Sequence, residues 1–233
     1  MKILALDTST NVATCAILED DTIIGEYSCN KGKTHSQSLM PMIDTLLKRV
    51  GFKASDMDAF AASVGPGSFT GLRIGVTTAK AMAFAAEKPV MSVYTLDALA
   101  WNLPLSKAIL CPVIDARNNQ VFTALYKFVN GKLDRLTDYL GIHINELADI
   151  IGPMDGEVVF LGDACRLHKD FFIEKLGERA AIAPPNAVSA RAASVAVLAG
   201  KMFLEGKSGS SYEMVPFYLR KSQAEQAIKD NKG

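Results

Sequence analysis

The stretch that decides the fold is "SVGPGSFTGLRIGVTTAKAMAFAAEKP", Ser63 to Pro89. It has three glycines in seven residues, Gly65 to Gly71, and then an apolar run with only two charges. A P-loop requires GxxxxGK[ST], so that its lysine reaches the β- and γ-phosphates, but Leu72 and Arg73 follow Gly71 here. The dinucleotide pattern GxGxxG fails because Thr70 stands at the third glycine. We therefore interpret the stretch as a buried strand followed by a helix.

The helix is predicted over residues 69–86, with Ser68 as its N-cap and Pro89 beyond its end. Small residues recur every four positions along it, at Gly67, Gly71, Gly75, Ala79 and Ala83. A four-residue step keeps them near one stripe of the helix. Glycine inside a helix costs up to about 1 kcal/mol relative to alanine, so the stripe needs a reason. It allows a second helix to approach closely, and composition leaves open whether that helix belongs to this chain or to a partner.

The rest of the chain alternates strands and helices twice. Before Pro104 we expect a strand at 2–7, a hairpin over 13–29, a helix over 39–50, a strand at 58–64, a strand at 89–93 and a short helix from Thr95. After Pro104 we expect strands at 108–116, 121–128 and 157–162, with helices over 145–151, 164–176 and 189–206. Two similar α/β halves follow from this order. We predict lobes at 1–104 and 105–211, with residues 212–233 packing back on the first lobe.

Composition excludes several classes of protein. The chain has 233 residues, 49% of them apolar, which is enough to bury a core without disulfides or metals. Its 25 basic residues balance 25 acidic ones and form no basic cluster, so an autonomous nucleic-acid binder is not expected. The four cysteines form no CxxC pair and indicate reduced thiols in the cytoplasm. No apolar stretch is long enough to span a membrane, and we expect no membrane contact.

Several segments together resemble one family. They are "ILALDTST" at Ile3, "HSQSLMP" at His35, "GPGSFTGLRIG" at Gly65, "VIDARNNQVFTALY" at Val113 and "PFYLRKSQAE" at Pro216. These resemble the TsaB (YeaZ) proteins of bacteria. The resemblance implies the actin-like fold of Hsp70 and sugar kinases, with two ribonuclease-H-like lobes and mixed sheets.

The resemblance also implies a function. Family members are non-catalytic subunits without a cofactor, which pair with TsaD and with the ATPase TsaE to transfer a threonylcarbamoyl group to adenosine 37 of tRNA. Such a chain forms a homodimer when alone and meets tRNA only through the complex.

In the family, the two early helices form the contact with TsaD. Carried over, this places the contact at Leu39, Met40, Ile43, Leu47, Gly71, Leu72, Gly75, Ala79 and Met82. This favours a partner helix on the small-residue stripe. On that interpretation, Gly75→Leu abolishes association and leaves the fold largely intact.

Residues for chemistry are sparse. TsaD carries HxxxH, whereas this chain has His35-Ser-Gln-Ser-Leu39, so we predict no metal site and no catalytic residues. Asp7, Thr8 and Ser9 match the first phosphate element of actin-like ATPases, but Asp115-Ala-Arg117 lacks the glycine of the second. The three are weak nucleotide-binding candidates, and a turn at the strand end is the preferred interpretation. The alternatives are a small actin-fold ATPase or kinase, tested by nucleotide turnover, and an M22-type metallopeptidase, tested by metal content.

Overall fold

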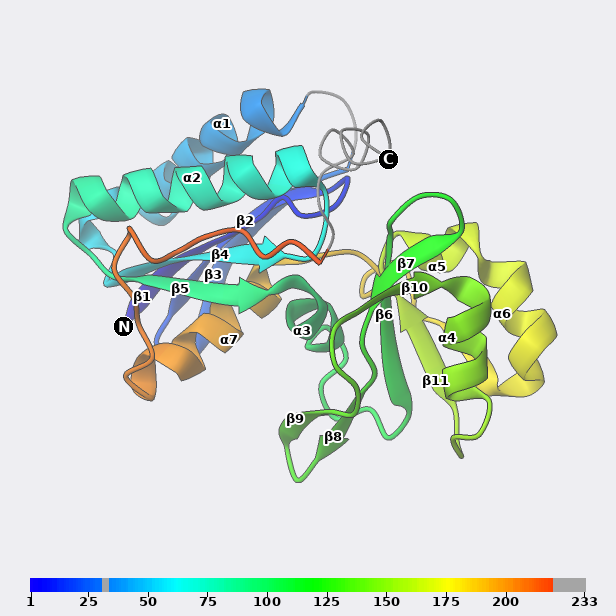
Figure 1. The fold of residues 1–233 in the computed structure, drawn as a ribbon. Helices are drawn as coiled ribbons and strands as arrows, with labels where there is room; N and C mark the ends of the chain where they lie inside the picture. The colour runs from blue at the N-terminus through cyan, green and yellow to red at the C-terminus, as the bar shows by residue number, and fades with distance from the viewer. Residues whose placement is uncertain (31–33, 220–233) are drawn as a thin grey trace.

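The computed structural model describes residues 1–30 and 34–219. In these residues the chain forms two mixed β-sheets, each packed against helices (Figure 1). The first sheet has the strand order β3-β2-β1-β4-β5. The second has the order β10-β7-β6-β11-β12, with β8 paired to β6 and β9 paired to β8.

The first sheet is built from the N-terminal part of the chain. Its strands are β1 (Lys2–Asp7), β2 (Ala13–Glu19), β3 (Thr22–Cys29), β4 (Ala59–Gly65) and β5 (Val90–Tyr94). β1 pairs antiparallel with β2 and parallel with β4, and β4 pairs parallel with β5. The elements between these strands are α1 (His35–Val50), the short 3₁₀ helix η1 (Ala54–Asp56), α2 (Phe69–Ala86) and, after β5, α3 (Thr95–Ala100).

Both faces of this sheet are buried, because successive side chains of a strand point to opposite faces. Leu4 and Leu6 of β1 pack in a cluster with α1 and α2, while Ile3 and Ala5 pack with α7 (Ala192–Leu204). Figure 1 shows α7 below the strands and α1 and α2 above them. Helix α7 lies in the range 105–211 that we assigned to the C-terminal lobe, yet its contacts are with the first sheet. The lobe boundaries themselves stay a prediction.

The second sheet and its helices pack around a hydrophobic core that is separate from the core of the first sheet. Its strands are β6 (Ile109–Asp115), β7 (Gln120–Thr123), β8 (Tyr126–Val129), β9 (Lys132–Arg135), β10 (Leu140–His143), β11 (Val158–Leu161) and β12 (Ala180–Ile182). Its helices are α4 (Ile144–Ile151), α5 (Ala164–Leu167), α6 (Lys169–Leu176) and the 3₁₀ helix η2 (Gly177–Arg179). In the core, the rings of Phe160 and Phe172 stack with centroids 4.0 Å apart.

Four predicted elements differ from those observed. The helix expected over 39–50 begins four residues earlier, at His35. The strand expected at 121–128 is divided into β7 and β8, because both pair with β6 at different heights and Ala124 and Leu125 lie between them. The helix expected at 164–176 is divided into α5 and α6 at His168. The helix expected from residue 189 begins at Ala192.

Residues 209–218 form what we call the C-terminal strap, which passes beside α2 and over the ends of β4 and β5 (Figure 1). Gly209 exchanges two backbone hydrogen bonds of 2.9 Å with Val90, and the Phe217 amide donates to the Val64 carbonyl at 2.7 Å. Met214 is buried in the cluster beneath α2. The strap therefore packs on the first sheet, whereas residues 220–233 of the predicted segment lie outside the described residues.

Two further properties of the described residues are the reactivity of the buried thiols and the length of the apolar helices. Cys15 and Cys111 are buried, and burial raises the pKa of each thiol to about 12, so both are unreactive at neutral pH. Among the described residues, no helix combines the length and the apolar content that crossing a membrane requires.

Candidate functional site

The small-residue stripe of α2 packs against the end of β1. A Cβ atom on Gly71 would lie 2.0 Å from the carbonyl oxygen of Thr8, and one on Gly75 would lie 2.4 Å from the Thr8 Oγ1 atom. Ala79 is also fully buried. The glycines are therefore needed for the close approach of α2 to its own sheet. The expectation that this stripe accepts a partner helix is wrong, because at Gly71 and Gly75 the space is already filled by Thr8, which directly follows β1.

The other residues predicted for a partner contact fall into two groups, those that are buried and those that are at least partly exposed. Leu39, Ile43, Leu47 and Leu72 are buried with the first sheet, so their assignment to a partner surface is corrected as well. Met82 is partly buried, and Met40 is 49% exposed. That α1 and α2 carry a partner contact stays a prediction, and in this conformation only their outer sides can supply it.

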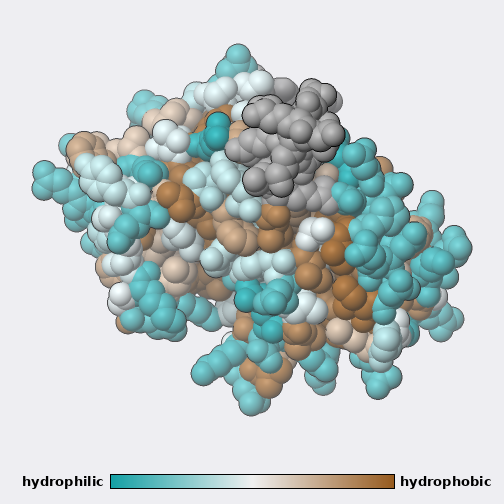
Figure 2. Space-filling view, in the orientation of Figure 1, coloured by the Kyte–Doolittle hydropathy of each residue, from teal (hydrophilic) through white to brown (hydrophobic). Residues whose placement is uncertain are grey.

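The outer side of α2 carries residues that the sequence analysis did not select. Arg73, Thr77 and Phe84 are exposed on it, and Phe84 exposes 62% of its surface. The Arg73 guanidinium lies 3.9 Å from the centroid of the Phe69 ring, and its Nε atom donates to the Tyr218 hydroxyl at 3.2 Å. Figure 2 shows hydrophobic surface in a broken band across the middle of this face, along the course of the strap. A wide apolar arc in the helix pattern is the signal that pointed to α2, but it did not separate the inner side from the outer.

The start of α2 is fixed by a cap that the sequence predicted. The Gly71 amide donates to the Ser68 Oγ atom at 3.2 Å, which confirms Ser68 as the N-cap. The Thr8 hydroxyl donates to the Gly71 carbonyl at 2.7 Å. One threonine thus joins the end of β1 to the first turn of α2.

Asp7, at the end of β1, is buried and hydrogen-bonded within the chain. Its Oδ1 atom accepts from the Ser9 amide at 2.8 Å and from the Ser9 hydroxyl at 2.6 Å, and its Oδ2 atom accepts from the Ser63 hydroxyl. Burial raises the pKa of Asp7, while the hydrogen bonds from Ser63 and Ser9 lower it, and the net shift is upward. These bonds give Asp7, Thr8 and Ser9 a structural role at the strand end. A nucleotide contact by these three residues stays a prediction.

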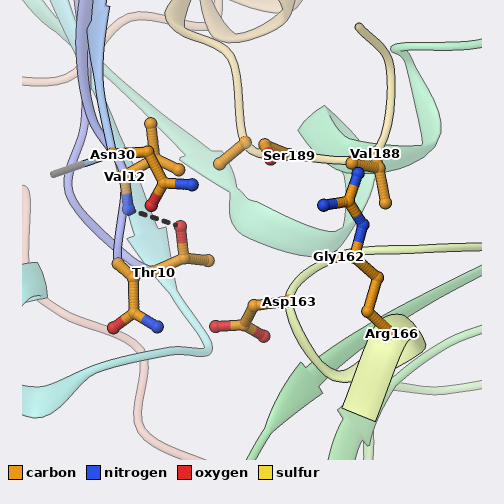
Figure 3. Close-up of a pocket in the computed structure, with 10 residues that line it drawn as sticks. Thr10, Val12, Asn30, Gly162, Asp163, Arg166, Val188 and Ser189 are labelled. Atoms are coloured by element: carbon orange, nitrogen blue, oxygen red, sulfur yellow. Dashed lines mark hydrogen bonds between the residues drawn. The ribbon is translucent and has the colours of Figure 1, made fainter. Parts of the chain in front are cut away.

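A cavity of about 140 Å³ lies between the two sheets. Thr10 and Asn30 lie on one side of it, Arg166 lies on the other, and Asp163 lies between the two sides in Figure 3. The Asp163 Oδ1 atom accepts a hydrogen bond from the Asp115 amide at 3.0 Å, so its position is set by β6. The full lining comprises Thr10, Asn11, Val12, Asn30, Gly162, Asp163, Arg166, Val188, Ser189 and Ala190.

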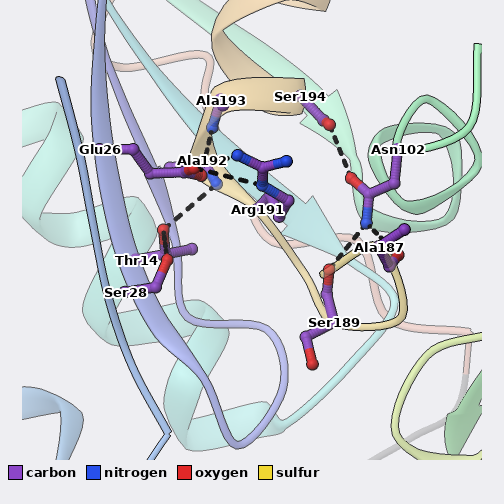
Figure 4. Close-up of polar contacts among 10 residues, drawn as sticks. All are labelled: Thr14, Glu26, Ser28, Asn102, Ala187, Ser189, Arg191, Ala192, Ala193 and Ser194. Carbon is purple, nitrogen blue, oxygen red and sulfur yellow. Dashed lines mark hydrogen bonds and ion pairs between the residues drawn. The ribbon is translucent and has the colours of Figure 1, made fainter. Parts of the chain in front are cut away.

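Polar side chains also join the connections between the sheets (Figure 4). The Asn102 Nδ2 atom donates to the carbonyls of Ala187 and Ser189 at 2.8 and 2.7 Å, and its Oδ1 atom accepts from the Ser194 hydroxyl. Asn102 follows α3, whereas the other three residues precede or begin α7. One amide therefore joins the segment that leaves the first sheet after α3 to the segment that returns to it before α7. Sequence reasoning missed this residue, because a single asparagine after a short helix carries no pattern.

The beginning of α7 is capped from the strands. The helix has no cap from its own N-cap residue, Arg191. Instead, Glu26 of β3 accepts from the Ala193 amide at 3.0 Å and from Arg191 Nε at 3.2 Å. Thr14 of β2 accepts from the Ala192 amide at 3.3 Å. These bonds satisfy helix N–H groups that would otherwise lack partners.

The stretch compared with the HxxxH motif packs as part of the fold. His35 Nε2 lies 2.8 Å from the Thr10 carbonyl oxygen, and Leu39 is on the buried side of α1. Position 39 therefore serves the core. Within residues 1–30 and 34–219, no group of three histidine, cysteine, aspartate or glutamate side chains converges in a way that could hold a metal ion.

The fold, together with the sequence segments quoted in the sequence analysis, defines a class of protein. The family described as "TsaD: tRNA N6-adenosine threonylcarbamoyltransferase" matches residues 27–228. Two solved structures share the fold at low sequence identity. They are the ethanolamine utilization protein EutJ from Carboxydothermus hydrogenoformans, with a TM-score of 0.51 and 13% identity, and the ROK hexokinase from Thermus thermophilus, with 0.50 and 12%. The first comparison covers 84% of this chain and 89% of that one, and the second covers 89% and 99%. The predicted α/β fold with mixed sheets, of the actin-like and sugar-kinase type, is confirmed.

Nearer relatives narrow the class. The tRNA threonylcarbamoyladenosine biosynthesis protein TsaB of Bacillus subtilis is 35% identical over 97% of this chain and 96% of its own length. The Escherichia coli protein of the same name is 30% identical over 96% of each. YeaZ from Pseudomonas aeruginosa is similar in structure, with a TM-score of 0.79 and 27% identity over 94% of this chain and 99% of that one. The chain belongs to the TsaB family.

Proposed function

We propose that the chain is a non-catalytic scaffold subunit in the formation of threonylcarbamoyladenosine at position 37 of tRNA. In this role it pairs with TsaD, works with the ATPase TsaE, forms a homodimer when alone and meets tRNA through the complex, in the cytoplasm. The observation that carries the proposal is the similarity, over nearly the full length, to proteins named for threonylcarbamoyladenosine biosynthesis.

Three features of the site support a role without catalysis. Leu39, at the position of the second histidine of HxxxH, is a core residue. Asp7 is buried and accepts three hydrogen bonds from Ser9 and Ser63. Asp115 accepts a hydrogen bond from the Arg117 amide at 2.8 Å, inside the turn that follows β6. Each of these residues has a structural task at the place where a relative with enzymatic activity would need a reactive group.

We place the TsaD contact on the outer sides of α1 and α2, and Met40, Met82 and Phe84 are its apolar candidates. Exposed aromatic and methionine side chains are the types enriched in protein interfaces. Arg73 and Tyr218 would add polar contacts at the N-terminal end of α2.

Reconstitution tests the function directly. TsaD, TsaE, tRNA and a threonylcarbamoyl donor are mixed with and without this chain, and modified tRNA is measured. Modification should require the chain, and sedimentation should show a complex with TsaD. Transfer at the full rate without the chain would overturn the proposal.

A pair of variants tests the surface. Phe84→Asp should abolish association with TsaD, whereas Ile173→Asp, which is also exposed but lies on α6 beside the second sheet, should leave it intact. Both proteins should keep the wild-type thermal midpoint. Equal binding by the two variants would move the contact away from α2.

The enzyme alternatives have their own measurements. ATP turnover that disappears in Asp7→Ala would favour an ATPase or kinase. One bound metal ion per chain that is lost in His35→Ala would favour a metallopeptidase.

A further inference from the structure

We propose that the C-terminal strap, residues 209–218, couples the stability of the first turn of α2 to the stability of the contact between the two sheets. The coupling passes through Phe217, whose ring lies against residues of both sheets. This inference concerns the chain alone and does not depend on the proposed function.

The first half of the argument is how the strap is held. Its backbone is tied to β5 through Gly209 and to β4 through Phe217, and Met214 is buried between them. The Tyr218 ring stacks on Phe69, in the first turn of α2, with centroids 4.8 Å apart. A Cβ atom on Gly65 would lie 2.3 Å from the Phe217 carbonyl oxygen, so the strap is in direct backbone contact with the end of β4. The strap therefore has a fixed course on the first sheet.

The second half is what Phe217 reaches. Its ring centroid lies 5.3 Å from that of Tyr94, at the end of β5, and 5.6 Å from that of Tyr139, which precedes β10 of the second sheet. The two tyrosine rings are themselves 4.8 Å apart. Three aromatic rings from three distant parts of the sequence thus meet where the two sheets approach each other, within the range of separations at which aromatic pairs attract.

The hydroxyl of Tyr139 continues the connection. It donates to the Asp97 carboxylate, at 2.9 Å from Oδ1 and 3.0 Å from Oδ2, and the Tyr126 hydroxyl of β8 donates to Oδ1 at 2.7 Å. Asp97 belongs to α3, so one carboxylate of the helix that follows the first sheet holds two tyrosines of the second. The Arg135 guanidinium lies 4.0 Å from the Tyr139 ring centroid. Tyr139 is therefore fixed at its hydroxyl by Asp97 and at its ring by Phe217.

If the strap packs less firmly, we expect the hydrogen bonds of residues 125–140 to open more often, although most of the strap does not contact these residues. Residues 125–140 are held by the Leu136 amide on the Leu125 carbonyl at 2.7 Å and by the Leu125 amide on the Thr137 hydroxyl at 3.0 Å. These bonds lie next to Tyr139 along the chain. Their opening reports the stability of this part of the second sheet.

The experiment is hydrogen exchange on the full chain with Phe217→Ala. The matched control is Tyr212→Ala, on the same strap, whose exposed ring meets the edge of Phe84. Removing one aromatic partner should speed exchange in residues 125–140 about 2–10-fold, while Tyr212→Ala leaves it unchanged. Exchange in β1 should stay at the wild-type rate in both.

Two results would overturn the proposal. In one, Phe217→Ala accelerates the strap amides and leaves residues 125–140 as in the wild type. In the other, exchange accelerates equally everywhere, β1 included, which reports lower global stability. If Phe217→Ala fails to fold, Phe217→Leu keeps the apolar volume and removes the ring, and the same criteria apply.

Trp101 supplies an independent readout, because it is the single tryptophan of the chain. Its ring lies 5.1 Å from that of Phe128 in β8, and Lys201 of α7 lies 3.7 Å from its centroid. It therefore sits between the two sheets without a contact to Phe217 among the ring pairs described. Acrylamide quenching of Trp101 fluorescence should increase in Phe217→Ala and not in Tyr212→Ala. Equal quenching in the two variants would count against the coupling.

Discussion

The β4–α2 junction of the first sheet and the β11–α5 junction of the second both need a residue with positive φ, but the helices that follow them differ in length. Each junction holds a glycine with positive φ: Gly65, the last residue of β4, at +127°, and Gly162, which directly follows β11, at +104°. A Cβ atom on Gly65 would lie 2.3 Å from the Phe217 carbonyl oxygen, and one on Gly162 would lie 2.2 Å from the Val113 carbonyl oxygen. After the first junction, α2 continues for 18 residues, whereas α5 ends after four.

The difference teaches what the additional glycines do. Gly71 and Gly75 lie on the long helix and face Thr8, at the end of β1, whereas α5 has the sequence ACRL, without glycine. The glycine at the strand end meets a requirement shared by both sheets, while the glycines inside α2 allow a long helix to lie close to a strand end. A glycine-rich signature in this fold therefore indicates close backbone packing before it indicates phosphate or a partner.

The sharpest test of the comparison is to fill one tightly packed glycine beside each sheet, Gly71 inside α2 and Gly162 after β11. Gly71→Leu and Gly162→Leu should each destabilise the chain by more than about 4 kcal/mol, because the obstructing atoms belong to the backbone and cannot rotate away. Urea denaturation measures the change. The control is Gly51→Ala, at φ +76° with no atom within 4 Å of the added Cβ, which should cost about 1–2 kcal/mol from backbone strain alone. A Gly71→Leu protein of wild-type stability would restore the partner interpretation of the stripe.

The helices that cover the two sheets provide the next test. Phe172→Ala removes the ring stacked on Phe160, and Leu39→Ala removes a buried side chain of α1. Each should cost about 3 kcal/mol, from lost burial and the cavity left behind. Met40→Ala, next in sequence but half exposed, should change stability by less than about 0.5 kcal/mol. Similar losses for Leu39→Ala and Met40→Ala would show that α1 is oriented differently.

A smaller effect is expected where the two regions are joined. Asn102→Ala leaves the carbonyls of Ala187 and Ser189 and the Ser194 hydroxyl without the amide, which should cost about 2 kcal/mol. Asn145→Ala removes an exposed amide side chain from α4 and should be nearly neutral. Thermal melts of the two variants compare them. Equal midpoints would mean that Asn102 adds nothing measurable to the connection.

The smallest effect is a pH dependence at Asp97. Burial raises the pKa of its carboxyl, while hydrogen bonds from Tyr126 and Tyr139 lower it, and the net shift is upward. Such a group adds stability that is fully present below its unfolded pKa of about 3.9 and is lost as pH rises through its folded pKa. The unfolding free energy of the wild type relative to Asp97→Asn should therefore increase as pH falls from 7 towards 4. A difference that shrinks over this range would mean that the tyrosines outweigh burial.

Much of this organisation was predictable. Periodic apolar patterns predicted most elements of the first sheet and the repeated α/β order, because burial on one or two faces imposes those patterns. The Ser68 cap was predictable from its residue type, because serine is a preferred N-cap. The inward side of α2 was not predictable, since a helix that is apolar nearly all round has no unique buried face. Asp97, Asn102 and Glu26 were missed for another reason. Each acts through partners more than 20 residues away in sequence, and no local pattern records such a contact.

The place of α7 has a consequence for the order in which the chain can fold during synthesis. Ile3, Ala5 and Leu18 face a helix that begins only at Ala192. At the usual translation rate of about 5–20 residues per second, roughly 10–40 s separate the emergence of β1 from that of α7. Throughout that interval α3 covers part of this face of the first sheet, through Ala98, but the part that packs against α7 stays open. A ribosome-bound fragment that ends before α7 should therefore bind holdase chaperones, and release should follow once α7 has left the exit tunnel.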